Sequence, residues 1–179
     1  MIVAVMAAIG ANAQTPKTFI EAGGGVFVPT DGSHVFYGET VGVGHYFTPM
    51  FGVGLQANYG TNNLVDKNDL GLVAVNGLAK VLSNRLMDID VKAGIGYGWH
   101  NVKYTVIEQG YLYYLKDERE SNASYIVPKV GVDVAFNILK SHKLQLVVSP
   151  EYSWYNVTEK EDFKNVGIFS VLGKVRFNF

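Results

Sequence analysis

The chain has 179 residues, a net charge of −1 and no cysteine, with 48% hydrophobic and 17% charged residues. This length suits one domain, and the hydrophobic content is not that of a disordered chain. The lack of cysteine excludes disulfide scaffolds, thiolate metal sites and cysteine nucleophiles, and the charge gives no argument for a nucleic-acid partner. Twenty glycines and 13% aromatic residues with few charges favour β-structure, as found in membrane barrels.

Residues 1–13 (MIVAVMAAIGANA) have the features of an export signal. They carry no charge, 2–9 form a short apolar run, and Ala11-Asn12-Ala13 fits the small-x-small pattern of a signal-peptidase site before Gln14. The run is too short to cross a bilayer as a helix. A basic segment normally precedes such a run, so we expect a few further residues, lysine among them, upstream. The sequence predicts a truncated signal peptide over 1–13 and a mature domain over 14–179; the alternative is a buried first strand or helix.

After Gln14 the apolar residues recur with a period of two, which predicts strands rather than helices. Two irregularities stand out. Glu39 and His45 fall on the apolar face of their strand, and Pro128 and Pro150 fall inside strands, where proline removes a hydrogen bond. We expect both prolines near the ends that carry the long loops. The predicted strands are 18–29, 36–47, 51–59, 71–82, 88–99, 126–138, 144–154 and 167–179.

Short and long connections alternate strictly between these strands. The short ones are 48–50, 83–87 and 140–143, and the longer, more polar ones are 29–35, 60–70, 100–124 and 155–165. This alternation predicts an all-β fold, an eight-stranded antiparallel up-and-down transmembrane β-barrel with short periplasmic turns and longer extracellular loops. Alternation inside 100–124 also predicts a hairpin that extends beyond the rim.

The polar face of the predicted strands carries five acidic and five basic residues. A soluble barrel would turn this face outward, whereas a membrane barrel turns it inward. Equal numbers favour a closed interior, because an unpaired buried charge is costly. Glycines on the same face, such as those at 94, 96 and 98, leave room for long side chains. We predict a lumenal ion-pair network made of Glu21, Lys80, Asp88, Asp90, Lys92, Lys129, Asp133, Glu151, Lys174 and Arg176.

Aromatic residues on the apolar face gather at two levels, which is typical of the girdles of a membrane barrel. Ordinary core aromatics would instead scatter along the strands. The group near the long loops is Tyr59, Tyr97, Trp99, Tyr152 and Trp154. The group near the short turns is Phe51, Phe136 and Phe177, with the terminal Phe179 beside it.

The C-terminal stretch VGIFSVLGKVRFNF ends in phenylalanine and resembles the terminal strand that the bacterial barrel-assembly machinery recognises. Over about residues 18–179 the chain resembles small eight-stranded outer-membrane proteins of the outer-membrane protein X and A types. The stretch YFTPMFGVGLQANYG resembles the porin-family barrels of Bacteroidetes. The resemblance implies a Gram-negative outer membrane, contact with its lipid, and Phe179 as the assembly signal.

Residues that could carry chemistry are few. The four histidines at 34, 45, 100 and 142 stand apart without metal-ligand spacing, so we predict neither a metal site nor a cofactor. Ser33-His34 with Asp31 and Ser141-His142 are adjacent Ser/His pairs, but neighbours on a strand point to opposite faces. We therefore predict a non-enzymatic outer-membrane barrel that anchors surface loops for structural, adhesive or protective roles. The alternatives are a narrow passive porin-like channel, a lipid A-modifying enzyme and a soluble secreted lipocalin-like barrel.

Overall fold

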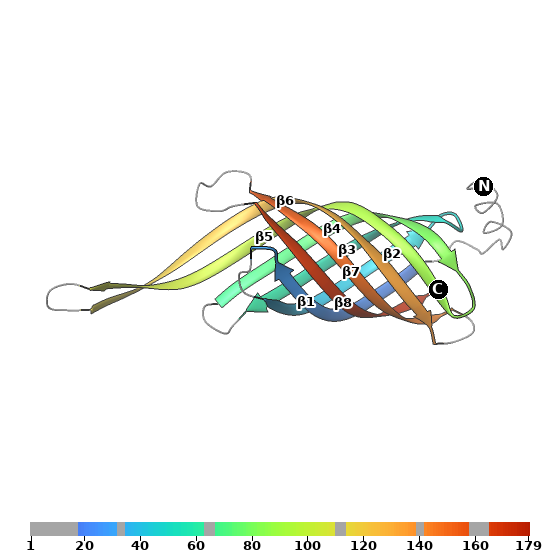
Figure 1. Cartoon of the computed structure of the whole chain (residues 1–179), viewed down its shortest axis with the longest axis horizontal. Helices are drawn as coiled ribbons and strands as arrows, with labels where there is room; N and C mark the ends of the chain where they lie inside the picture. The colour runs from blue at the N-terminus through green and yellow to red at the C-terminus, as the bar shows by residue number, and fades with distance from the viewer. Residues whose placement is uncertain (1–17, 32–34, 63–66, 110–113, 139–141, 158–164) are drawn as a thin grey trace.

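The computed structural model describes residues 18–31, 35–62, 67–109, 114–138, 142–157 and 165–179. Every strand pairs antiparallel with its neighbours in the chain, and β8 pairs back onto β1, which closes the sheet into a barrel (Figure 1). The predicted eight-stranded up-and-down barrel is confirmed. Its strands are β1 (Thr18–Pro29), β2 (Phe36–Tyr46), β3 (Phe51–Asn62), β4 (Lys67–Ser83), β5 (Met87–Gln109), β6 (Tyr114–Asn137), β7 (Leu144–Val157) and β8 (Val166–Asn178).

The strands are strongly staggered around the barrel. A walk along paired residues that starts at Phe19 on β1 returns to β1 at Pro29, a displacement of ten residues. With a rise of about 3.3 Å per residue and strands about 4.8 Å apart, this stagger tilts the strands by about 40° from the barrel axis. A barrel of eight strands is only wide enough for side chains to fill its interior.

Short polar turns close one end of the barrel, here called the turn end. Between β2 and β3, Thr48 Oγ1 accepts a 2.8 Å hydrogen bond from the backbone N–H of Phe51. Between β4 and β5, Asn84 Oδ1 accepts backbone N–H groups from Leu86 and Met87 at 2.8 and 2.9 Å. Threonine and asparagine stabilise tight turns in this way because their short side chains reach the backbone. The C-terminus lies at this end (Figure 1), where Phe179 N–H donates to Thr18 C=O at 2.8 Å.

The opposite end, here called the hairpin end, is where β5 and β6 project beyond the other strands (Figure 1). Their pairing is continuous from Met87↔Phe136 to Gln109↔Tyr114, whereas β4 stops pairing with β5 at Lys67↔Lys103. The predicted hairpin is confirmed, but it is not a separate element. The strands expected at 88–99 and 126–138 run into it without a break.

One expectation about the prolines is wrong. Pro150 pairs with Val171 in the middle of β7 and β8, far from either rim. The β6–β7 ladder keeps one register but is interrupted twice in the described residues, between Ile126 and Lys129 and between Gly131 and Val134. Both interruptions fall at a proline or opposite one. Since proline has no N–H, the barrel tolerates it at mid-height by leaving this seam incompletely hydrogen-bonded.

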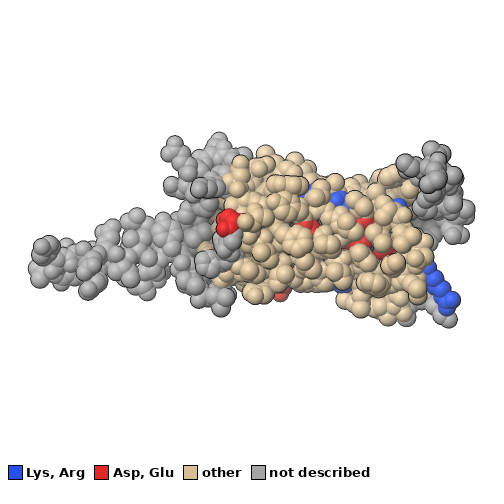
Figure 2. Space-filling model, in the orientation of Figure 1, with Lys and Arg blue, Asp and Glu red and all other residues tan. Residues whose placement is uncertain are grey.

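The two faces of the sheet differ in polarity. Exposed apolar side chains such as Val41, Leu55 and Ile95 cover the outside, and on the face that Figure 2 shows, acidic and basic atoms of the described residues occupy only small areas. Glu39 and His45 also face outward, as the sequence indicated. No helix in the described ranges is long and apolar enough to cross a membrane.

Candidate functional site

The lumen at the turn end is filled by ion pairs centred on Arg176 of β8. Its Nε donates to Glu21 Oε2 at 2.8 Å, its Nη1 to Asp90 Oδ2 at 3.0 Å and its Nη2 to Asp133 Oδ2 at 2.5 Å. Lys174, two residues earlier on the same inward face, donates to Glu21 Oε1 at 2.6 Å. One guanidinium thus joins carboxylates from β1, β5 and β6 across the barrel.

A second group continues this network towards the middle of the lumen. Lys92 Nζ lies 2.6 Å from Asp133 Oδ1 and 2.5 Å from Glu151 Oε1, and Lys129 Nζ lies 2.8 Å from Glu151 Oε2. Gly131 makes this approach possible, because a Cβ there would stand 3.0 Å from the Glu151 and Lys92 side chains. All these charges are nearly inaccessible to solvent, so each depends on its partners.

The structure joins eight of the ten predicted lumenal charges and leaves two apart. The joined residues are Glu21, Asp90, Lys92, Lys129, Asp133, Glu151, Lys174 and Arg176. Lys80 and Asp88 form a separate pair at the turn-end mouth, 3.7 Å apart, where Asp88 also accepts hydrogen bonds from Ser83 and Gln145.

Neutral side chains complete the network. Gln56 donates to Glu151 at 3.1 Å and accepts from Lys129 at 3.0 Å, and Thr40 donates to Asn58 at 2.8 Å. Ser149 donates to Asp133, which also pairs with Lys92. Alternation along the strands places these residues on the polar face, but the count of charges does not predict that Gln56 and Ser149 bridge ions.

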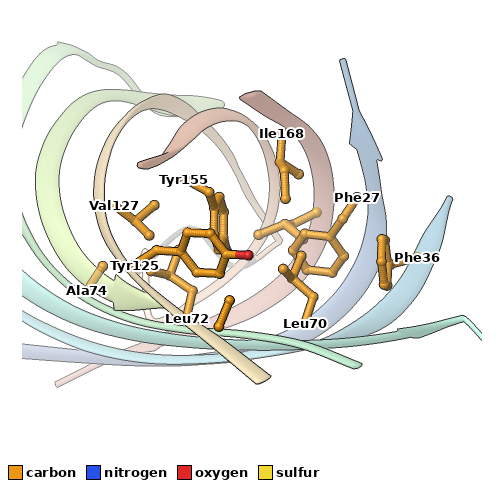
Figure 3. Packing of buried hydrophobic residues seen from close by; sticks show 11 residues of the cluster. Phe27, Phe36, Leu70, Leu72, Ala74, Tyr125, Val127, Tyr155 and Ile168 are labelled. Carbon is orange, nitrogen blue, oxygen red and sulfur yellow. The ribbon is translucent and has the colours of Figure 1, made fainter. Parts of the chain in front are cut away.

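The hairpin-end half of the lumen is filled by an apolar cluster, which differs from the charged lumen that the sequence predicts. Eleven buried residues from β1, β2, β4, β6, β7 and β8 pack together there, and Figure 3 shows their side chains converging on the barrel interior. Tyr125 and Tyr155 meet edge-to-face, with ring centroids 5.4 Å apart. A Cβ at Gly98 would stand 2.7 Å from the Tyr155 ring, so this glycine leaves room for a tyrosine and not for a charged side chain. The cluster consists of Phe27, Phe36, Leu70, Leu72, Ala74, Ala123, Tyr125, Val127, Tyr155, Ile168 and Leu172.

The aromatic residues predicted for the girdles all lie on the outer wall or beside it. Tyr59, Tyr97, Trp154, Phe51, Phe136, Phe177 and Phe179 are exposed. Trp99 and Tyr152 are half-buried, because Trp99 lies against Gly71 and Tyr152 against Gly167. On β3, Phe51 and Tyr59 are eight positions apart, which at the strand tilt is about 20 Å along the barrel axis. The apolar band of outer-membrane barrels is about 25 Å tall.

The candidate chemical groups do not come together in the described residues. His45 bonds Thr18 on the outer wall at 2.9 Å, His100 packs edge-on against Phe36, and His142 lies 3.7 Å from Asp88. Ser33, His34 and Ser141 lie outside the described residues. No group of three or more potential metal ligands is found in the part that is described.

This arrangement is the reverse of a soluble barrel, whose apolar face would point inward. The soluble lipocalin-like alternative is therefore contradicted by the exposed apolar wall and the buried charges. The porin-like alternative needs an open path along the axis, and the ion network and the apolar cluster both occupy that path.

Comparison with solved structures supports the fold. No family model and no curated protein sequence matches the chain. Neisserial surface protein A superposes with a TM-score of 0.69 at 13% identity, over 94% of this chain and 99% of that one. A major outer membrane protein of Thermus thermophilus gives 0.66 at 17% identity, over 93% and 100%. Ail, the attachment invasion locus protein of Yersinia pestis, gives 0.58 in complex with the heparin analogue sucrose octasulfate, at 13% identity over 93% and 100%. The chain has the fold of small outer-membrane barrels.

Proposed function

We propose that this protein is a non-enzymatic integral barrel of a bacterial outer membrane that anchors its β5–β6 hairpin at the cell surface. The observation that carries the proposal is a closed barrel with an apolar outside and a filled lumen. In such a barrel no backbone edge is left unpaired in lipid, so it can span a bilayer. The outer aromatic residues then serve as the two girdles, and the turn end faces the periplasm.

Export and assembly belong to the same proposal. Residues 1–13 serve as the signal peptide, so N-terminal sequencing of the mature protein should begin at Gln14. The C-terminal strand serves as the contact for the barrel-assembly machinery, with Phe179 at its end. Phe179 is 69% exposed at the turn end, so its ring is available to another protein.

Fractionation of cells followed by electrophoresis tests the membrane assignment. The protein should pellet with outer membranes, and the unboiled protein should migrate differently from the boiled one, because a closed barrel resists detergent at room temperature. Identical migration together with solubility in the absence of detergent would contradict the proposal.

Trypsin treatment of intact cells tests orientation and display. The hairpin contains Lys116 and Arg119, whereas Lys143 lies at the turn end. Cleavage should occur in the hairpin of intact cells, and after Lys143 only once the cells are opened. In a matched variant, residues 104–119 are replaced by an Asn-Gly turn between the paired Lys103 and Glu120. That variant should still reach the membrane but resist cleavage of the hairpin on intact cells.

If the hairpin is adhesive, we expect its partner not to be a polyanion such as the heparin analogue in the complex with Ail. Residues 101–124 contain three basic and four acidic side chains, the basic ones being Lys103, Lys116 and Arg119. This balance gives no attraction for sulfated chains at physiological salt. Retention of the purified protein on a heparin column at physiological salt would contradict this expectation.

A further inference from the structure

A small cavity lies inside the turn half of the lumen, between the ion-pair network and the wall formed by β3 and β4. Its volume is about 10 Å³, close to the least that one water molecule needs. Both apolar and polar residues line it. The polar side chains are Glu21, Gln56, Asn76, Lys92 and Asp133, and Gly54 lies among them.

Asn76 is the residue in this lining whose hydrogen bonding is incomplete. Its side chain is only 3% exposed, and Oδ1 has no hydrogen-bond partner. An unpaired buried carbonyl oxygen is destabilising, because it has lost its hydrogen bonds to solvent without gaining others. Gly54, its neighbour on β3, has no side chain and lines the cavity. Gly94, its neighbour on β5, lies outside the lining, and a Cβ there would stand 2.5 Å from Asn76 Oδ1.

The charge balance of the network indicates which molecule fits. Its four acidic residues face four basic residues, so a bound ion would add an uncompensated charge in a site without solvent. A neutral molecule of minimal size with hydrogen-bond donors is needed. We propose that one ordered water molecule occupies this cavity, donates one O–H to Asn76 Oδ1, and donates the other to a carboxylate in the lining, that of Glu21 or Asp133.

Substitution of Gly54 separates a filled cavity from an empty one by the sign of its effect. A Cβ at Gly54 would stand 3.4 Å from the Val43 carbonyl oxygen and 3.6 Å from Leu78 Cδ1, which are ordinary contacts. In Gly54→Ala the methyl group enters the cavity without moving the backbone. If water is bound, its loss leaves Asn76 Oδ1 unpaired, so the urea midpoint of the refolded protein should fall. If the cavity is empty, the methyl group fills a void and the midpoint should rise.

Gly77→Ala is the matched control, since a Cβ there meets only the Ala93 carbonyl oxygen at 3.7 Å. It measures the effect of replacing a strand glycine with alanine away from the cavity. In an Asn76→Leu background, which lacks the acceptor, Gly54→Ala should shift the midpoint as Gly77→Ala does. Equal shifts for Gly54→Ala in both backgrounds, whether up or down, would overturn the proposal.

Magnetisation transfer from water gives a direct measurement on the unmodified protein in detergent micelles. A long-lived buried water should give a cross-peak to the Asn76 side-chain amide or the Gly54 N–H, and the corresponding peak should be lost in Gly54→Ala. The absence of any such peak in the unmodified protein would also overturn the proposal. This measurement does not depend on whether Asn76→Leu folds.

Discussion

Glu151 shows how one residue in the lumen depends on its partners. It accepts from Lys92, Lys129 and Gln56, and it is the carboxylate within ion-pair distance of Lys129 in the described residues. Removing one member of a buried pair leaves the other charge uncompensated, which costs about 3–5 kcal/mol. We expect Glu151→Gln, which keeps the shape, to lower the free energy of unfolding by about that amount in urea titrations.

Lys80→Met provides the control for this loss. Lys80 pairs with Asp88 at 3.7 Å and is more exposed at the mouth of the barrel. Because this pair is long and Asp88 keeps its hydrogen bonds from Ser83 and Gln145, we expect Lys80→Met to lower the free energy of unfolding less than Glu151→Gln does. A similar loss in Glu151→Gln and Lys80→Met would contradict the special role of the buried network.

Val171 tests which face meets lipid. It lies at mid-strand on β8, 38% exposed on the outer wall, while neighbouring Ser170 faces inward. Arginine on the lipid face costs about 2–4 kcal/mol at the midplane and about 0–1 kcal/mol near the interfaces. Val171→Arg should therefore destabilise the protein in lipid vesicles clearly more than Ile126→Arg, which lies near the hairpin end. Equal losses of stability in the two variants would mean that Val171 does not lie at the bilayer midplane, or that the barrel does not span a bilayer.

Phe179 acts in assembly in our proposal and not in stability. Its ring is exposed at the turn end beyond the last residue of β8. We expect Phe179→Ala to reduce the yield of barrel in outer membranes while purified protein still refolds into detergent with an unchanged urea midpoint. Phe177→Ala, on the same face of the strand, is the control for simple loss of an aromatic side chain. Unchanged membrane yield in Phe179→Ala would contradict the assembly role.

At the scale of the elements, the seam between β6 and β7 is the least complete. Its interruptions at Pro128 and Pro150 leave backbone groups without a ladder partner. Such seams open locally more easily than complete ones. The β7–β8 seam on the other side of Pro150 pairs without interruption from Leu144↔Phe177 to Tyr155↔Val166.

Pro150→Val restores a backbone N–H at this seam. We expect slower hydrogen exchange over 130–135 of β6, because a ladder hydrogen bond can then form there. Exchange over 168–174 of β8 serves as the internal reference and should not change, since that ladder is already complete. Unchanged exchange over 130–135 would mean that the proline is not the cause of the interruption.

For the whole molecule, two different barriers lie in series along the barrel axis. The apolar cluster closes the hairpin end and the ion network closes the turn end. Planar-bilayer recordings should therefore show no steady conductance. Replacing Tyr155 with glycine should not open a channel, because the ion network remains in place. Large stable steps in the unmodified protein would favour the porin-like alternative.

Much of this architecture follows from the sequence alone. Period-two alternation and the alternation of short and long connections determine eight antiparallel strands, because each strand must turn one face to lipid or core and each link must span one rim. The same alternation assigns residues such as Thr40, Gln56 and Arg176 to one face. Shifting the register of a strand by one residue would move all its apolar side chains to the lumen and its polar ones to the outside. The sequence therefore determines which face each residue occupies.

Which lumenal side chains of distant strands lie at the same height, by contrast, is decided only by the tertiary structure. A residue on the polar face has the same local sequence pattern whether it meets Arg176 or Tyr155 in the lumen. The stagger of ten residues decides which residues of distant strands lie at the same height. That stagger divides the lumen into an ionic half and an apolar half, and it places Pro150 at mid-height. Register between distant strands is a property of the closed barrel, and no local stretch of sequence encodes it.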